Sequence, residues 1–244
     1  MKLTLEGKKP IVIDKKYFNI ESEGRNQNTP YTNEFLKGTV NSDFKYRLRG
    51  YTNLQTKIDG LYNSYFDLMG GVGLTGRIYN EGVSDIRFND FSLDCVNIIS
   101  QNYPEASVYS EDMFNFNYGD YRPDLILIDF NDFTYKKYLD KYKSVLSDAM
   151  DASSKYVIIN DCSVFYLRYG QKAYEVYSNL LGKKITSKDE FFEEMRSFYK
   201  VEFPDWNLTD VETFGSSSLM LFRKDVKSLD VNVMKESGNL LTIE

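Results

Sequence analysis

The chain has 244 residues, of which 42% are hydrophobic and 27% are charged, with a formal net charge of −6, and this is ordinary usage for a globular domain. It contains no histidine, which excludes Ser-His and Cys-His nucleophilic machinery and any His-ligated zinc or iron site. The two cysteines, Cys95 and Cys162, make no disulfide or metal framework, so a reducing, cytoplasmic setting is expected. No apolar run is long enough to cross a membrane, and the N-terminus lacks the apolar core of a signal peptide, so no membrane partner is expected.

The charge is unevenly distributed. Residues 1–58 carry 11 Lys and Arg against 6 Asp and Glu, a net charge of +5, so the remainder carries −11. Within this basic front, residues 44–51 (Phe-Lys-Tyr-Arg-Leu-Arg-Gly-Tyr) alternate basic side chains with aromatic and aliphatic ones. Cations neutralise phosphates and aromatic rings stack on bases, so this composition suits a nucleic-acid-binding arm; an edge strand with a charged face is the alternative.

Elements follow one another in a regular alternation. A short strand is predicted at 10–14, a turn-rich loop at 21–34 and a short helix at 54–62. Later strands are predicted at 64–67, 85–90, 106–112, 124–129 and 155–160, and helices at 74–82, 92–102, 135–152, 166–182 and 188–199. Residues 207–213 and 217–222 predict a closing hairpin with an antiparallel strand at one edge of the sheet. The alternation predicts an α/β fold: a doubly wound, mostly parallel seven-stranded sheet with a C-terminal antiparallel hairpin strand.

The organisation expected from this pattern has three parts. Residues 1–58 form the N-terminal basic-aromatic arm or lid, residues 59–226 the α/β domain, and residues 227–244 a polar, loosely held tail. The sequence leaves the oligomeric state open.

Residues 66–76 (Phe-Asp-Leu-Met-Gly-Gly-Val-Gly-Leu-Thr-Gly) place a glycine-rich turn between the first core strand and a helix. Glycine accepts positive φ and lets backbone approach a ligand closely, and the N–H groups of a following helix can face that ligand. The stretch therefore indicates a nucleotide-like ligand.

Acids recur at the predicted strand ends. Asp67, Asp90, Asp112 and Asp129 are 23, 22 and 17 residues apart, about one strand-helix unit each. In open parallel sheets ligands bind outside the carboxyl ends of the strands, so these acids are expected to surround one site. An acid about 20 residues after the glycine turn suits the hydroxyls of a ribose.

Taken together, the turn and the acids resemble the motifs of the class I S-adenosylmethionine-dependent methyltransferases over residues 60–224. The resemblance implies S-adenosylmethionine as the cofactor. The cofactor-binding residues that it implies are Asp67, Met69, Gly71 and Gly73 in the turn, Asp90 and Phe91 after the second core strand, and Asp112 and Met113 after the third. Gly71-Val-Gly73-Leu-Thr-Gly76 also matches the fingerprint of NAD-binding domains, so a dinucleotide is the second candidate.

The acceptor is less defined. Asp129, Asn131 and Asp132 follow the fourth core strand, where the resemblance implies the catalytic side of the site. The segment beginning Asn89-Asp90 is similar to the second motif of tRNA and rRNA base methyltransferases and, with residues 44–51, favours a nucleic acid as acceptor and partner.

Two alternatives stay open for the acceptor. Residues 128–138 resemble the metal-dependent catechol and caffeoyl-CoA O-methyltransferases, with Asp129, Asn160 and Asp161 as oxygen ligands for Mg²⁺. The last alternative is a non-catalytic binding or assembly subunit with the same fold. The abundance of Tyr, Phe, Asn and Lys suits an AT-rich genome such as that of a phage or virus.

Overall fold

The structure is a computed structural model, and it describes most of the chain. It describes residues 1–14, 17, 42–58, 61–129, 139–161, 182–214, 217–224, 226, 228–235 and 240–244. The predicted loop at 21–34 lies outside these residues, as do Asn131 and Asp132 and all but the last residue of the predicted helix at 166–182.

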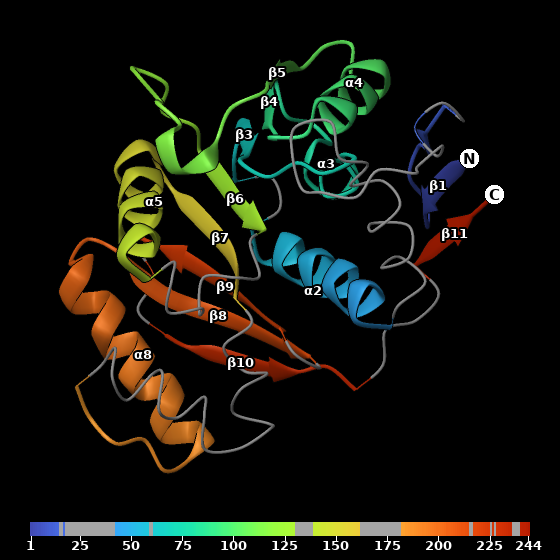
Figure 1. The fold of residues 1–244 in the computed structure, drawn as a ribbon. Helices are drawn as coiled ribbons and strands as arrows, with labels where there is room; N and C mark the ends of the chain where they lie inside the picture. Colours follow the sequence, from blue (N-terminus) through green and yellow to red (C-terminus); the bar gives the residue numbers. More distant parts are fainter. Residues whose placement is uncertain are drawn as a thin grey trace.

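The centre of the fold is an eight-stranded sheet with the order β10-β8-β9-β7-β6-β3-β4-β5 (Figure 1). Its strands are β3 (Ser64–Asp67), β4 (Asp85–Asn89), β5 (Ser107–Tyr109), β6 (Leu125–Asp129), β7 (Tyr156–Asp161), β8 (Asn207–Phe214), β9 (Ser217–Arg223) and β10 (Asp230–Val233). The predicted mostly parallel α/β sheet is confirmed. Two details differ from the prediction: β10 adds an eighth strand, and the antiparallel strand β9 lies inside the sheet, between β7 and β8.

Helices cover both faces of this sheet, because successive strand residues point to opposite sides. On β6, Leu125 and Leu127 join one core cluster, while Ile126 and Ile128 join the other. The first cluster lies under α2 (Ser42–Ile58), α3 (Gly76–Tyr79) and α4 (Leu93–Asn102). The second lies under α5 (Leu139–Ala152) and α8 (Lys188–Glu202), which Figure 1 shows on the opposite side of the sheet. Near-continuous apolar strands are the expected result of burial on both faces.

The basic-aromatic residues 44–51 belong to the helix α2 and not to an extended segment. Leu48, Tyr51, Leu54 and Ile58 recur at intervals of three and four residues and are buried, so the helical period overrides the apparent alternation. A Cβ at Gly50 would lie 2.7 Å from Leu219 Cδ1, which shows how closely α2 approaches β9.

The C-terminal segment, expected to be loosely held, contributes strands to two sheets. Besides β10, the strand β11 (Leu241–Ile243) pairs with β1 (Lys2–Leu5), which pairs in turn with β2 (Ile11–Val12). The two termini therefore lie side by side (Figure 1). The Asn102 side chain joins this small sheet to α4, since it accepts from Val12 N at 2.7 Å and donates to Val12 O at 2.8 Å.

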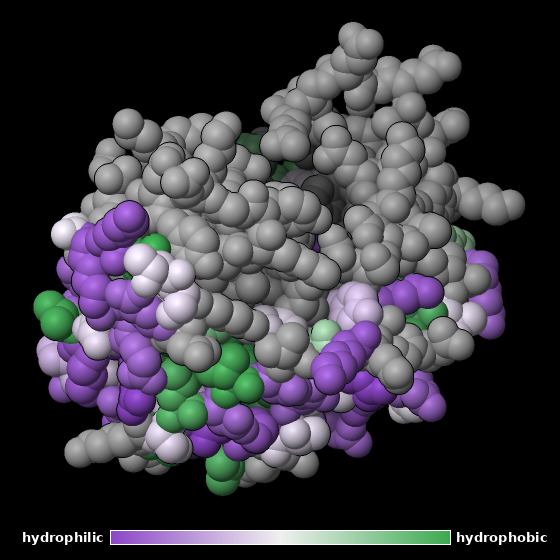
Figure 2. Space-filling view, turned by 90° about the horizontal axis from the view of Figure 1, so that it is seen from below, coloured by the Kyte–Doolittle hydropathy of each residue, from purple (hydrophilic) through white to green (hydrophobic). Residues whose placement is uncertain are grey.

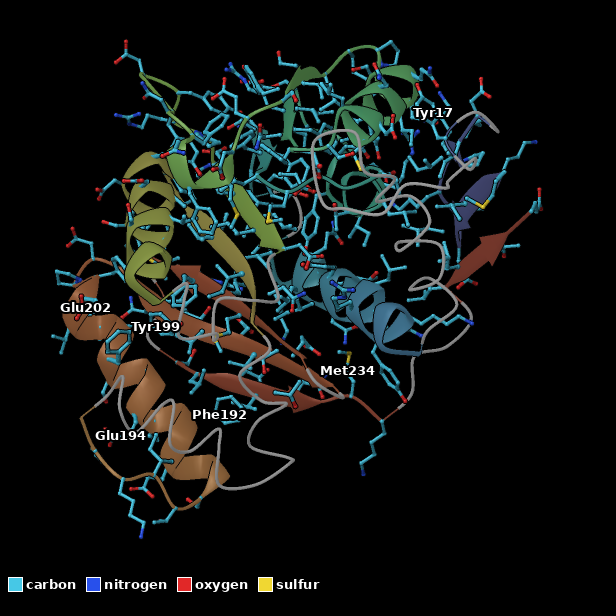
Figure 3. All side chains as sticks on the ribbon, in the orientation of Figure 1. Tyr17, Phe192, Glu194, Tyr199, Glu202 and Met234 are labelled. Atoms are coloured by element: carbon cyan, nitrogen blue, oxygen red, sulfur yellow. The ribbon has the colours of Figure 1, made fainter. Side chains whose placement is uncertain are left out.

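Packing also continues beyond β10. Asn53 Nδ2 of α2 lies 3.7 Å from Met234 Sδ, and Figure 3 shows Met234 next to α2. Lys57 Nζ lies 3.1 Å from Asp230 Oδ2, so a second contact joins the same helix to β10. The C-terminal segment is therefore part of what holds α2 on the sheet.

The described surface is mostly hydrophilic in the view of Figure 2, with a small group of hydrophobic residues within it. Among the described residues, the exposed large apolar side chains are Val12, Leu61, Phe91, Leu93, Val201 and Val231. No helix in the described part of the chain has the length and apolar character needed to span a membrane.

The pairing of β11 with β1 predicts that the C-terminal residues stabilise the protein. Leu241→Ala should lower the free energy of unfolding by about 2–3 kcal/mol, because Leu241 belongs to the core cluster under α2. Val231→Ala on β10 is the control, and its cost should stay below about 1 kcal/mol because Val231 is already 36% exposed. Urea titration of both variants measures the difference. Equal small losses would mean that β11 contributes little.

Candidate functional site

The candidate site lies at the carboxyl ends of β3, β4, β5 and β6. These strands are parallel, and β3 lies between β4 and β6, so the order of strands reverses at β3. Such a reversal is where open α/β sheets bind ligands. Asp67 and Asp129 end β3 and β6, Asp90 directly follows β4, and Asp112 follows β5.

The glycine turn after β3 is shaped by packing against β4 and α4. Gly71 and Gly73 have φ of 54° and 85°, in the left-handed region that favours glycine. A Cβ at Gly76 would lie 2.6 Å from Phe88 Cζ and 2.8 Å from Tyr103 Oη. Tyr103 Oη also donates to Gly73 O at 2.5 Å, so the turn is fixed from the side of α4.

Asp67 is a buried carboxylate that holds this turn in place. It accepts hydrogen bonds from Tyr65 Oη at 2.7 Å, from Met69 N at 3.3 Å and from Thr75 Oγ1. Burial raises the pKa of Asp67 to about 7, although the Thr75 and Tyr65 hydroxyls favour the charged form. Asp67 therefore contacts the turn itself, and its contact with a cofactor stays a prediction. Tyr65 and Thr75 were missed by the sequence analysis, although Tyr65 precedes Asp67 by two residues and so shares its face of β3.

Asp90 connects the end of β4 to the same turn. Its two oxygens accept from Gly71 N and Ser92 N, each at 2.8 Å. Burial raises the pKa of Asp90 to about 6, against the effect of these two backbone donors. The next residue, Phe91, is 49% exposed. The end of β4 thus offers a carboxylate beside an exposed aromatic ring.

Asn89 was not among the predicted site residues, yet it joins three strand ends. Its buried side chain donates to Leu68 O at 3.1 Å and to Glu111 O at 2.9 Å, and accepts from Glu111 N at 2.9 Å. Its backbone carbonyl accepts from Gly70 N at 2.8 Å. Asn89 therefore sets the spacing of the ends of β3, β4 and β5. In the sequence, its place directly before Asp90 is what could have indicated that it belongs to the site.

The two predicted residues after β5 differ in exposure. Asp112 is exposed and caps the short 3-10 helix η2 (Met113–Asn115), accepting from Phe114 N at 3.1 Å and from Asn115 Nδ2 at 3.3 Å. Met113 is buried, and Met69 of the turn is half-buried against the same core cluster. Asp112 is thus the more accessible of these side chains.

Asp129 is held by two side chains from distant parts of the chain. Arg47 Nη1 lies 3.1 Å from Asp129 Oδ1, and Asn160 Nδ2 lies 2.5 Å from the same oxygen. The Asp129 side chain is only 15% exposed and that of Arg47 is 20% exposed. Arg47, predicted to bind phosphates, thus lies within the candidate site, and Asn160, predicted as a metal ligand, serves as a hydrogen-bond donor.

Comparisons with known proteins identify the fold. No known family profile matches the sequence, and no curated protein matches it. Among solved structures, the plantazolicin methyltransferase BpumL, in complex with a triazolic desmethylPZN analog and SAH, superposes with a TM-score of 0.57 at 13% identity, covering 87% of this chain and 94% of that chain.

Two further structures give the same result. PH1948 from Pyrococcus horikoshii, a proposed RNA methyltransferase, has a TM-score of 0.51 at 14% identity, covering 74% of this chain and 85% of that chain. The N-methyltransferase NodS from Bradyrhizobium japonicum WM9, in complex with S-adenosylhomocysteine, has a TM-score of 0.50 at 9% identity, covering 74% and 87%. The chain therefore has the class I methyltransferase fold, which it shares with these solved methyltransferases.

The packing of the glycine turn yields a stability prediction. Gly76→Ala should cost about 1–3 kcal/mol, because the new Cβ overlaps the Phe88 ring. Phe88→Leu should remove part of that overlap, so the double variant should cost less than the sum of the two single variants. Thermal unfolding of the four proteins measures the coupling, and strictly additive losses would mean that Phe88 is not the obstacle.

Proposed function

We propose that this chain binds S-adenosylmethionine between the glycine turn and Asp90 and transfers its methyl group to an acceptor beside Asp129. One observation carries the proposal: the carboxylate of Asp90 accepts from Gly71 N at 2.8 Å, so the acid and the turn form one continuous binding edge. The fold supports the same conclusion, because the solved structures of BpumL and NodS contain the demethylated product.

The chemistry of the residues fits this donor. The Asp90 carboxylate can accept from ribose hydroxyls, and the exposed Phe91 ring offers an apolar face to a flat purine. The donor's sulfonium is cationic, which suits an edge lined by Asp90, Asp112 and Asp129. The bound donor supplies an electrophilic methyl group, and the residues of this chain orient the two reactants and receive a proton from the acceptor.

A dinucleotide fits the same edge less well. In a dinucleotide site the N–H groups of the glycine turn receive the pyrophosphate. Here Gly71 N already donates to Asp90, and the carboxylate at that position would repel a phosphate. This contact favours the methyl donor over NAD.

A nucleic-acid acceptor is our finer proposal, and its support comes from two basic residues of α2 and from the likeness to PH1948. Lys45 and Arg49 are half-exposed, whereas Arg47 is paired with Asp129. The guanidinium of Arg47 also competes with any divalent cation at Asp129, so the Mg²⁺-dependent alternative requires that this pair opens. The side chain of Asp161 lies outside the described part of the structure.

The donor site is tested by calorimetry with S-adenosylhomocysteine. Asp90→Ala should weaken binding by about 1.5–3 kcal/mol, the scale of hydrogen bonds to a charged group. Since the pKa of Asp90 is about 6 and the ionised form is the better acceptor, wild-type affinity should fall about tenfold from pH 7.5 to pH 5. Asp90→Asn should remove most of this pH dependence and thereby separate it from the titration of Asp67. Binding of NAD without binding of S-adenosylhomocysteine would refute the proposal.

The nucleic-acid proposal is tested by salt dependence. Replacing Lys45 and Arg49 by Gln should weaken RNA binding and reduce the slope of log affinity against log salt by about 1–2, because each phosphate contact releases a counterion. Lys57→Gln, which removes a charge on the same helix that is already paired with Asp230, is the control. An unchanged slope in the double variant would argue against this acceptor.

A further inference from the structure

The two oxygens of Asp129 differ in their hydrogen bonds. Arg47 Nη1 and Asn160 Nδ2 both bind Oδ1, at 3.1 and 2.5 Å. Within the described ranges, Oδ2 has no hydrogen-bond partner. Two donors on one oxygen fix the rotation of the carboxylate, so Oδ2 is left to receive a hydrogen-bond donor from outside the protein.

The two donors reach Asp129 for different structural reasons. Asn160 lies opposite Asp129 in the register of β7 and β6, so the sheet itself places it. Arg47 comes from α2, which is held on the sheet by the buried side chains of Leu48, Tyr51 and Leu54. The orientation of the carboxylate therefore depends on the docking of α2.

Tyr51, one helical turn after Arg47, adds a second polar group. Its side chain is 1% exposed, and its hydroxyl has no hydrogen-bond partner among the described residues. Burial, followed by the charge of Asp129, raises the pKa of Tyr51 well above its usual value, so the hydroxyl stays neutral. A buried hydroxyl without a partner costs stability, which is tolerated where a ligand supplies the partner.

The charges around Asp129 limit the chemistry of the acceptor. Asp67 and Asp129 both act on the Tyr51 hydroxyl, and Arg47 opposes them. Among the described residues, Arg47 is the cation that contacts Asp129, and its charge is already engaged by that carboxylate. The local environment favours a neutral or cationic acceptor and disfavours a carboxylate as the reacting group.

We propose that Arg47 is a positioning residue that turns Asp129 Oδ2 toward the acceptor, and that the reacting atom is an amine nitrogen or a hydroxyl oxygen bearing a proton. This inference rests on the proposed function and names the chemistry of its acceptor. The heteroatom forms a bond to the methyl carbon with its lone pair, the carbon–sulfur bond breaks with its electron pair remaining on sulfur, and the proton of the heteroatom passes to Asp129 Oδ2.

The acceptor class is tested with tritiated S-adenosylmethionine and a library of amines, phenols, alcohols and carboxylic acids, with total RNA included. Label should enter compounds through nitrogen or oxygen atoms that carry a proton. Label entering carboxylates or ring carbons would overturn the inference, and so would no label at all from a protein that binds S-adenosylhomocysteine. Failure to bind that product would instead refute the proposed donor site.

The role of Arg47 is tested with Arg47→Gln on the acceptor that is labelled. The rate at saturating donor and acceptor should fall 10- to 100-fold, while the affinity for S-adenosylhomocysteine stays within twofold. Arg47→Lys should recover part of the rate, because it retains the charge. Lys57→Gln should keep the wild-type rate, because its ion pair with Asp230 is exposed and the buried side chains that dock α2 remain in place. A wild-type rate in Arg47→Gln, or a tenfold loss of product affinity, would overturn the assignment.

A readout independent of turnover comes from Tyr51. Tyr51→Phe should leave the melting temperature unchanged or raise it, because it removes a hydroxyl that has no partner among the described residues. Tyr62→Phe is the matched control and should lower the melting temperature, since the buried Tyr62 hydroxyl donates to Tyr79 O at 2.8 Å. A loss of stability in Tyr51→Phe as large as that in the control would show that the hydroxyl is already satisfied inside the protein.

Discussion

A buried carboxylate at the end of β3 is the constraint on which the candidate site depends. Asp67 is fully buried, and its pKa of about 7 reflects the cost of burying a charged carboxylate. Two hydroxyls and one backbone N–H offset that cost, and all three belong to the turn or to the strand before it. The turn is thereby fixed in the shape that lets Gly71 N meet Asp90 across two strands.

The donor side and the acceptor side of the candidate site are built from different elements. The donor side is built from strand ends that share the central sheet, tied by Asn89 and by the packing of Phe88 and Tyr103 against the glycine turn. On the acceptor side one of the two groups that hold Asp129 is Arg47, which comes from α2, a helix before the first core strand. In our proposal the glycine turn and Asp90 bind the methyl donor. The helix α2 then completes the acceptor side of the site through Arg47.

Much of the fold could be predicted from the sequence because its signals are local. Apolar runs such as residues 124–129 mark strands buried on both faces, and Ser92 marks the start of α4, where its side chain accepts from Cys95 N. The edge-strand alternative for residues 44–51 was wrong, because a short alternation of basic and aromatic residues looks extended until Leu54 and Ile58 are included in one helical period. The prediction also missed β10 and β11, since such short strands acquire their stability from partners far away in the chain.

The sequence by itself determined the class of fold, the place of the glycine turn and the spacing of the acids, since these follow from periodicity and from the conformational freedom of glycine. Only the tertiary structure decided what each acid does. Asp67 holds the turn, Asp90 joins it, Asp112 caps η2, and Asp129 is held by Arg47 and Asn160. The physical reason is that a carboxylate's role is set by its burial and by its donors, and those donors come from residues that are distant in sequence.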